Sequence, residues 1–219
     1  MEGRAEVRRT LVAAAVALFD ERGYDDTTVD DITAVAGVGR RTFFRYFRSK
    51  EDAISPDHET ALARIAEIFE NARPDEPAAG LVLRAGETVF DLYTDDPPLS
   101  VARFRLTHRV PVLRDRESAS VDHYRRLFTR YLRRRFADVG GEGDDAELRA
   151  AVTGAAVVAA HNLALRAWLA EGAPADGEAD CRARFRKVAR LLPDEHDLRT
   201  VTERLESAVV RLESRQGTA

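Results

Sequence analysis

Hydrophobic residues recur at helical spacing along almost the whole chain. In the first segment Val7, Leu11, Ala14 and Leu18 fall on one face of a helix with charged residues opposite, and Gly23 follows as a stop signal. No alternating run of apolar and polar residues is long enough to indicate a β-strand. The pattern therefore predicts an all-α protein.

Two short helices and then a longer one are predicted after this first helix. Thr28 begins the second, with an acid three residues later as in a capping box, and Gly37 ends it with a residue suited to a tight turn. A third short helix is expected over about 40–47. The sequence Ser49-Lys50-Glu51-Asp52 again resembles an N-terminal cap, and it predicts a longer fourth helix that runs to about Ala72.

Beyond Pro74 the predicted helices are longer and are separated by proline and glycine. We divide the chain into an N-terminal head of three short helices, residues 1–50, and a helical body, residues 51–219. The expected helices of the body after this point cover residues 77–94, 98–109, 116–138, 145–172, 177–191 and 195–214.

The third short helix concentrates positive charge. The chain has 219 residues and a formal net charge of −4, yet the segment from Ala36 to Lys50 holds five cations and no acid. Phe43 and Phe47 lie four residues apart and can anchor one face of the helix. The other faces then present Arg40, Arg41, Phe44, Arg45 and Arg48. Such a local basic patch indicates a polyanionic partner at one end of the protein.

Arginine at these positions suits DNA, because its planar fork bonds to phosphate or to guanine with two parallel hydrogen bonds. Short helices joined by a glycine turn describe a helix-turn-helix, whose last helix enters the major groove. A solvated amphipathic helix with incidental charges is the alternative. The glycine turn, the two capped neighbouring helices and the absence of acids favour the DNA-binding interpretation.

Residues 28–54, TVDDITAVAGVGRRTFFRYFRSKEDAI, resemble the signature of the TetR/AcrR family of transcriptional regulators, and the likeness covers about residues 7–54. The segment GRRTFFRYF also resembles the branch that includes mycofactocin-associated regulators. The resemblance implies a homodimer that binds a palindromic double-stranded DNA operator through two heads. A small-molecule effector in the body would then change the distance between the heads and release the DNA, as in a repressor.

The resemblance also implies roles for individual residues. Arg40 and Arg41 take the place of base readers, with Thr42 close to them, and Arg45 and Tyr46 lie where the family contacts phosphate or the groove edge. Lys50 and Thr28 match positions that contact phosphate. Two departures are Phe44, where many relatives have tyrosine, and Arg48, where proline is frequent. The DNA-binding candidates are Thr28, Arg40, Arg41, Thr42, Phe44, Arg45, Tyr46 and Lys50.

In the body we expect a ligand pocket and a dimer face. Small and apolar residues of the 145–172 helix suit close helix packing with the 177–191 segment of a partner, namely Ala155, Val158, Ala159, Leu163 and Trp168. The pocket should take an apolar or amphipathic effector, such as an acyl thioester. Its candidate residues are Phe90, Tyr93, Phe104, His108, Tyr124, Phe128, His161 and Asn162. Aromatic residues at such positions are more often core residues than ligand contacts, and a core or interface role is also the default for His161 and Asn162.

Other chemistry finds little support in the sequence. Cys181 is the only cysteine, and no apolar run reaches bilayer length, so we expect a cytoplasmic protein without a membrane partner. No metal, cofactor or catalytic motif is recognisable, and Asp57-His58-Glu59 would point in different directions on a helix. The remaining alternatives are a helical sensor or interaction protein without DNA binding, and a cofactor-free enzyme that depends on His161.

Overall fold

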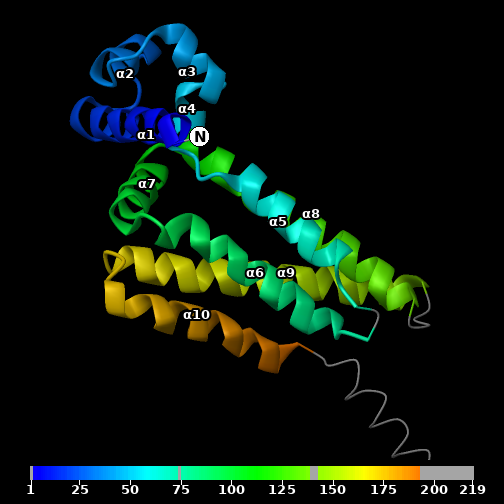
Figure 1. The fold of residues 1–219 in the computed structure, drawn as a ribbon. Coiled ribbons are helices and arrows are strands. Elements are labelled where there is room, and N and C mark those ends of the chain that lie inside the picture. The colour runs from blue at the N-terminus through cyan, green and yellow to red at the C-terminus, as the bar shows by residue number, and fades with distance from the viewer. Residues whose placement is uncertain (1, 74, 139–142, 193–219) are drawn as a thin grey trace, which may run out of the picture.

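The computed structural model describes residues 2–73, 75–138 and 143–192, and within these ranges it contains helices and no strand (Figure 1). The all-α prediction is confirmed. A group of short helices forms the head at one end, and longer helices form the body below it in the view of Figure 1. The predicted helix over 195–214 lies outside the described residues.

The head surrounds one small hydrophobic core. Leu11, Phe19, Ile32 and Phe43 are its most deeply buried large side chains. Ala53 and Ile54 also lie in this core, so the helix after residue 50 packs with the head, and the division at residue 50 stays a prediction. The head helices are α1 (Glu2–Arg22), α2 (Val29–Val35), α3 (Arg40–Tyr46) and α4 (Lys50–Ile54).

Local sequence signals account for the helix-turn-helix geometry. The Thr28 side chain accepts a hydrogen bond from the Asp31 amide, and the Asp31 carboxylate accepts one from the Thr28 amide, which completes the predicted capping box. Gly37 has a φ of +67°, a value that residues with a Cβ rarely adopt. These two features fix the start of α2 and the turn toward α3.

The body packs around a second hydrophobic cluster that includes Phe90, Phe128, Leu132, Val157 and Phe185. Leu106 and Leu113 instead pack in the head core, so the body contacts the head directly. The body helices are α5 (His58–Glu70), α6 (Ala78–Thr94), α7 (Pro97–Arg109), α8 (Pro111–Asp138), α9 (Gly143–Ala170) and α10 (Glu178–Arg186), with short 3₁₀ turns at Ala175–Gly177 and Lys187–Leu191.

Two predicted boundaries were wrong, both near prolines. The single helix expected from residue 49 to about Ala72 is two helices, because Pro56 has no amide hydrogen and the preceding Ser55 is extended, with ψ of 140°. The helix expected to start at residue 116 starts at Pro111, since proline is well tolerated in a first helical turn.

One helix meets the length and composition criteria for crossing a membrane. Residues Ala146–Ala170 of α9 have a mean hydropathy of 1.4 in the most apolar window, and 44% of that window is buried inside the protein. Val157 and Leu165 of this helix lie in the core of the body. A core helix meets the same criteria, so this apolarity is explained by packing.

Candidate nucleic-acid interface and ligand cavity

Helix α3 is held to the head by its aromatic face. Phe43 is completely buried and Phe47 is 3% exposed, with their ring centroids 5.5 Å apart. The prediction that these two residues anchor α3 is confirmed. The opposite face of the helix is thereby turned to solvent.

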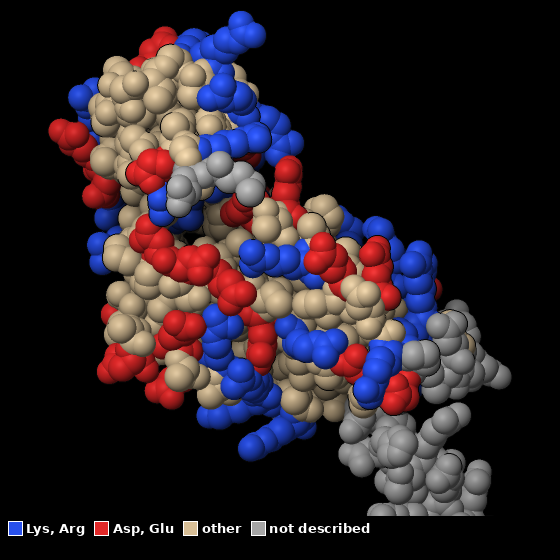
Figure 2. Space-filling view, viewed as in Figure 1, with Lys and Arg blue, Asp and Glu red and all other residues tan. Residues whose placement is uncertain are grey.

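The exposed face of α3 carries arginines without acidic partners. Arg41 and Arg45 are exposed and form no ion pair with any residue that the structure describes. The Arg45 guanidinium lies 5.3 Å from the centre of the half-buried Tyr46 ring. Figure 2 shows Lys and Arg side chains gathered on the side of the head where Figure 1 places α3. This face offers free guanidinium groups to a polyanion.

Arg40 is differently placed. Its Nη1 lies 2.7 Å from Asp30 Oδ1 of α2, and its guanidinium lies 5.3 Å from the centre of the exposed Phe44 ring. The side chains of Arg40 and Asp30 are 60% and 69% exposed. Such exposed pairs contribute only about 0–1 kcal/mol, so a phosphate or base edge could replace Asp30 at little cost. Arg40 is paired in the free protein, unlike Arg41.

Lys50 points toward the protein itself. Its Nζ donates hydrogen bonds to the carbonyl oxygens of Tyr24 at 2.6 Å and Thr27 at 2.9 Å. In the free protein the ammonium thus ties the loop before α2 to α4, and a phosphate contact by Lys50 stays a prediction. Thr28 is exposed but its hydroxyl serves the capping box, and Thr42 is half-buried at the start of α3.

Arg4 was not singled out from the sequence, yet it lies beside the same surface. Its guanidinium is 5.9 Å from the Tyr46 ring centre, on the side of the ring that α1 faces. The four residues Arg4, Val7, Arg45 and Tyr46 line one shallow surface depression together with Gly3. No pattern in the sequence connects residue 4 with residue 46; only the packing of α1 against α3 brings them together.

Arg48 is exposed as expected, but it pairs with acids of the protein itself. Its guanidinium lies 3.2 Å from Glu59 Oε1 and 3.5 Å from Asp52 Oδ2, and its amide donates to the same Asp52 oxygen at 3.0 Å. Arg48 therefore joins the α3–α4 connection to the first turn of α5. A charge that seemed to be presented to DNA instead stabilises the junction between head and body.

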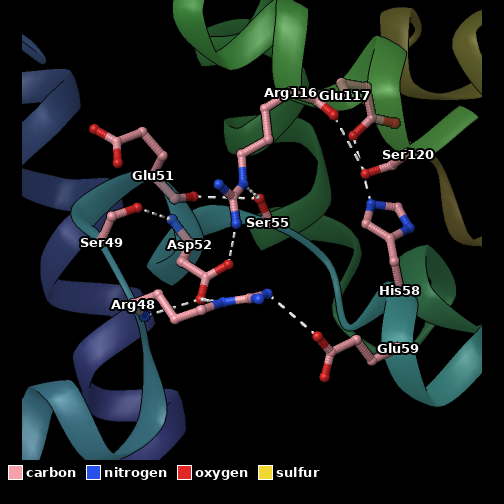
Figure 3. A network of polar contacts seen from close by, with 10 residues as sticks. All are labelled: Arg48, Ser49, Glu51, Asp52, Ser55, His58, Glu59, Arg116, Glu117 and Ser120. Carbon is pink, nitrogen blue, oxygen red and sulfur yellow. Dashed lines mark hydrogen bonds and ion pairs between the residues drawn. The ribbon is translucent and has the colours of Figure 1, made fainter.

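Asp52 is the centre of that junction (Figure 3). Besides Arg48 it pairs with Arg116 of α8, whose Nε also donates to Ser55 Oγ at 3.1 Å. The Asp52 amide donates to the Ser49 side chain at the start of α4. One carboxylate thus links the last head helix to the long body helix α8.

Two adjoining cavities lie beneath this junction. The larger, of about 170 Å³, lies between the α4–α5 link, α7, α8 and α9, and the smaller, of about 20 Å³, lies between α5, α6, α8 and α9. Tyr93, Glu117 and Asn162 line both. The larger cavity is also bounded by Ser55, Pro56 and Arg116, so its wall includes part of the head–body junction.

Seven of the eight predicted pocket residues line these cavities. Phe104 and His108 line the larger one, Tyr124, Phe128 and His161 line the smaller one, and Tyr93 and Asn162 line both. Phe90 lines neither. It is fully buried, with its ring centroid 4.1 Å from that of His161 and 5.5 Å from that of Phe185, and is a core residue.

Ionisable groups in the cavity walls are perturbed by burial. Burial lowers the pKa of His161 to about 4, so the ring is neutral at neutral pH. Burial alone would raise the pKa of Glu117, but the neighbouring His58 ring and Tyr93 hydroxyl outweigh it, and the pKa lies below its usual value. His58 Nε2 is 3.6 Å from Glu117 Oε2, and Tyr93 donates to Oε1 at 3.3 Å.

The match to a protein-family model lies in the head. Residues 11–53 match the family model described as "Bacterial regulatory proteins, tetR family". This segment contains α2, the Gly37 turn, the anchored α3 and nearly all of α4. The N-terminal region of the chain belongs to the TetR family.

Curated relatives agree with this assignment. The chain is similar to the uncharacterized HTH-type transcriptional regulator YdgC of Bacillus subtilis, with 33% identity over 106 residues, 46% of this chain and 54% of that protein. It is also similar to the proposed mycofactocin biosynthesis regulator MftR of Mycobacterium tuberculosis, with 42% identity over 57 residues, 26% of this chain and 29% of that protein. The chain thus spans about half the length of YdgC and less of MftR. Both relatives are named as transcriptional regulators and neither as an enzyme.

Solved structures extend the likeness of fold to the body. FadR of Bacillus subtilis, solved in complex with stearoyl-CoA, matches with a TM-score of 0.56 and 22% identity over 84% of this chain and 96% of that chain. A TetR-family regulator from Syntrophomonas wolfei matches with a TM-score of 0.58 and 18% identity over 84% of this chain and 95% of that chain. Because both matches cover most of this chain, the likeness of fold extends beyond the head into the body.

Proposed function

We propose that the protein is a ligand-responsive transcriptional repressor, located in the cytoplasm, that binds a palindromic operator as a homodimer. Residues 1–50 would form the DNA-binding domain and residues 51–219 the ligand-binding and dimerisation domain. The observation that carries the proposal is the solvent face of α3, where Arg41 and Arg45 lack partners among the described residues while Phe43 and Phe47 fix the helix from behind. Family membership of this region and the named regulators that it resembles support the same role.

Different residues of the head would contact the bases and the phosphates of the DNA. Arg41, near the N-terminus of α3, would reach base edges in the major groove, with Arg40 joining it once a phosphate or base replaces Asp30. Arg45, Tyr46 and the neighbouring Arg4 would contact phosphates. Thr28 and Thr42 lie at helix starts near this face, and the exposed Phe44 would support Arg40 by stacking. Lys50 holds the loop before α2, and its contact with phosphate stays a prediction.

A homodimer is needed to place two heads on a palindrome, and α9 offers a suitable face. Leu148, Val152 and Leu163 are 65%, 58% and 65% exposed, and the small residues Ala155 and Ala159 lie exposed between them. This stripe allows close approach of a second α9. Val158 and Trp168, also expected at this face, are buried within the body instead.

An effector would act through residues that belong both to the wall of the larger cavity and to the head–body junction. Arg116 lines the larger cavity and at the same time pairs with Asp52 of α4. A ligand that displaces Arg116 would free α4 to move with the head, which would change the spacing of the two recognition helices. The FadR structure holds an acyl thioester in a related fold, which supports an apolar or amphipathic effector.

Binding to DNA from upstream of the protein's own gene tests the proposal. The expected result is a shifted complex whose affinity falls steeply with salt, because each neutralised phosphate releases counterions. Light scattering should show a dimer for the wild type and a monomer for Leu163→Glu, with Val112→Glu, exposed on α8, as the control.

A helical sensor that does not bind DNA is the second candidate, and one observation favours it: two cations expected to face DNA, Lys50 and Arg48, contact the protein itself. Failure of the wild-type dimer to bind any upstream DNA, together with retained ligand binding, would support this candidate over the repressor.

A further inference from the structure

Arg103 of α7 is a half-buried cation without a hydrogen-bond or ion-pair partner among the described residues. Its Nε is inaccessible to solvent and makes no hydrogen bond, and among the described residues the side chain forms no ion pair. The nearest acids do not satisfy it: Asp96 caps α7 by accepting from the Leu99 amide, and Glu117 is bound to Tyr93 and faces His58. A guanidinium that loses part of its hydration without gaining a partner is destabilised, so an anion bound at this position would be favourable.

The electrostatic surroundings of Arg103 strengthen this conclusion. Burial, and next the repulsion from Arg8 of α1, lower the pKa of Arg103 to about 10, so the guanidinium is still charged at neutral pH. Arg8 itself lies 3.7 Å from Asp57, which draws it toward the start of α5. Asp96 and Glu117 partly offset this repulsion, but neither forms an ion pair with Arg103.

Arg103 lines the larger cavity, whose wall is cationic on one side and apolar on the other. Arg114, Arg116 and Arg166 are the other cations, and Glu117 is the only carboxylate among the lining residues. Arg114 donates to the His108 carbonyl oxygen and Arg116 is held by Asp52 and Ser55, whereas Arg166 is exposed. The apolar part of the wall consists of Ile54, Pro56, Phe104, Leu113, Leu165 and Leu169.

We infer that the larger cavity binds an amphipathic anion, with its carboxylate or phosphate on Arg103 and its apolar body against Phe104, Leu165 and Leu169. A guanidinium forms charge-assisted hydrogen bonds with either head group, which are stronger than neutral ones. A volume of about 170 Å³ is close to the roughly 150 Å³ known to hold an aromatic ring, so the enclosed part of the ligand is small, a ring or a medium-length chain.

The inferred site rests on the proposed function only where the anion is called an effector. Its place supports that role, because Ser55, Pro56 and Arg116 of the head–body junction form part of the same wall. An anion bound at Arg103 would lie among the contacts that connect α4 to α8. Binding of the anion to the protein and release of the DNA can be tested in separate experiments.

Calorimetry with three matched probes tests the site: octanoate, octyl phosphate and uncharged octanol. We expect at least one anion to bind the wild-type protein about 10- to 100-fold more tightly than octanol, the range expected for one hydrogen bond to a charged group. Which anion binds better distinguishes a carboxylate from a phosphate ligand. Equal binding of octanol, or no binding of either anion, overturns the inference.

Substitution of Arg103 assigns the preference to this residue. Arg103→Met should abolish the advantage of the anion over octanol, while Arg103→Lys should keep part of it because the charge remains. Arg105→Met is the control, since Arg105 is an exposed neighbour on α7 that does not line the cavity. If Arg103→Met binds the anion as tightly as the wild type does, the inference is wrong.

The unfolding temperature of Arg103→Met and the effect of octanoate on the DNA complex show which part of the inference has failed, if one does. Arg103→Met should unfold at the same or a higher temperature than the wild type, because it removes a half-buried unpaired charge; a large decrease would mean that Arg103 serves the fold instead. Addition of octanoate to the DNA complex tests the effector role alone. Anion binding without DNA release would keep the site and reject that role, whereas absence of DNA binding would reject the repressor and leave the calorimetric result standing.

Discussion

The head and the body each contain arginines without acidic partners, but in opposite environments. Arg41 and Arg45 of α3 are exposed, so water solvates them and they cost nothing in the free protein. Arg103 of α7 is half-buried and its Nε is shielded from solvent, so its lack of a partner is costly until a ligand supplies one. The difference teaches that a surface cation attracts any polyanion, whereas a half-buried one selects a small anion that fits.

The strongest way to break this comparison is to remove the support of α3. Phe43→Ala should destabilise the protein by about 3–5 kcal/mol, because it leaves a large cavity in the small head core. Urea denaturation measures this change. Phe44→Ala is the matched control: its ring is 47% exposed, and the loss should be about 1 kcal/mol or less. Equal effects of the two substitutions would contradict the described anchoring of α3.

A charge in the interior of the body should destabilise the folded state. Protonation of His161 tests this, because it adds a positive charge there as the pH falls. Burial lowers its pKa from 6.5 to about 4, so between these values the unfolded chain binds a proton that the folded chain does not. Stability should therefore fall as the pH decreases from 6.5 to 4, by roughly 2–3 kcal/mol for this residue. In His161→Gln this part of the pH dependence should disappear from chemical denaturation curves.

The matched control for this titration is His123→Gln, an exposed histidine on α8. Its denaturation curves should follow the pH dependence of the wild type. A His161→Gln variant that also follows the wild type would show that the body interior tolerates charge, and it would weaken the case for Arg103 as an anion receptor.

Removal of one exposed arginine of α3 sharpens the comparison on the DNA side. Arg41→Ala should lose about 1–3 kcal/mol of operator affinity, roughly 10- to 100-fold, and should relax the preference for one base. Fluorescence anisotropy on matched and mismatched duplexes measures both. Arg130→Ala, an exposed arginine on α8, serves as the control and should bind like the wild type.

The smallest expected effect concerns the link between the two regions. The half-buried pair of Arg116 and Asp52 should contribute about 1 kcal/mol in a double-mutant cycle with Arg116→Gln and Asp52→Asn. DNA affinity without ligand should change little, because neither residue lies on the α3 face. The response to an effector should weaken. A full response in Arg116→Gln would exclude this link as the route of the signal.

Local patterns were enough to predict the head. Phe43 and Phe47 four residues apart, the Thr28 cap and Gly37 each have consequences within one turn of helix, and the structure shows them as expected. Pro56 was also visible in the sequence, yet the helix predicted to begin after the Ser49 cap was extended through this proline. The error came from giving periodicity more weight than a missing amide hydrogen.

The cavity could be predicted only in part. Aromatic residues at helical spacing pointed to most of its wall, but Arg103 and Arg105 cannot be told apart in the sequence, since both are arginines of one amphipathic helix. Their different exposure depends on which side of α7 packs against other helices, among them α1, which is distant in the chain. For the same reason the sequence did not reveal that Arg48 pairs with Glu59, or that Lys50, a DNA-binding candidate, donates to the carbonyl oxygens of Tyr24 and Thr27.

The central claim is that α3 presents free guanidinium groups to DNA. The most direct test is the salt dependence of binding to the upstream duplex, measured by anisotropy for the wild type and for the double variant Arg41→Ala, Arg45→Ala. We predict a steep loss of wild-type affinity with salt and a slope that is smaller by about one for each phosphate contact removed. Wild-type binding that is independent of salt, or a double variant with unchanged affinity and slope, would contradict the claim.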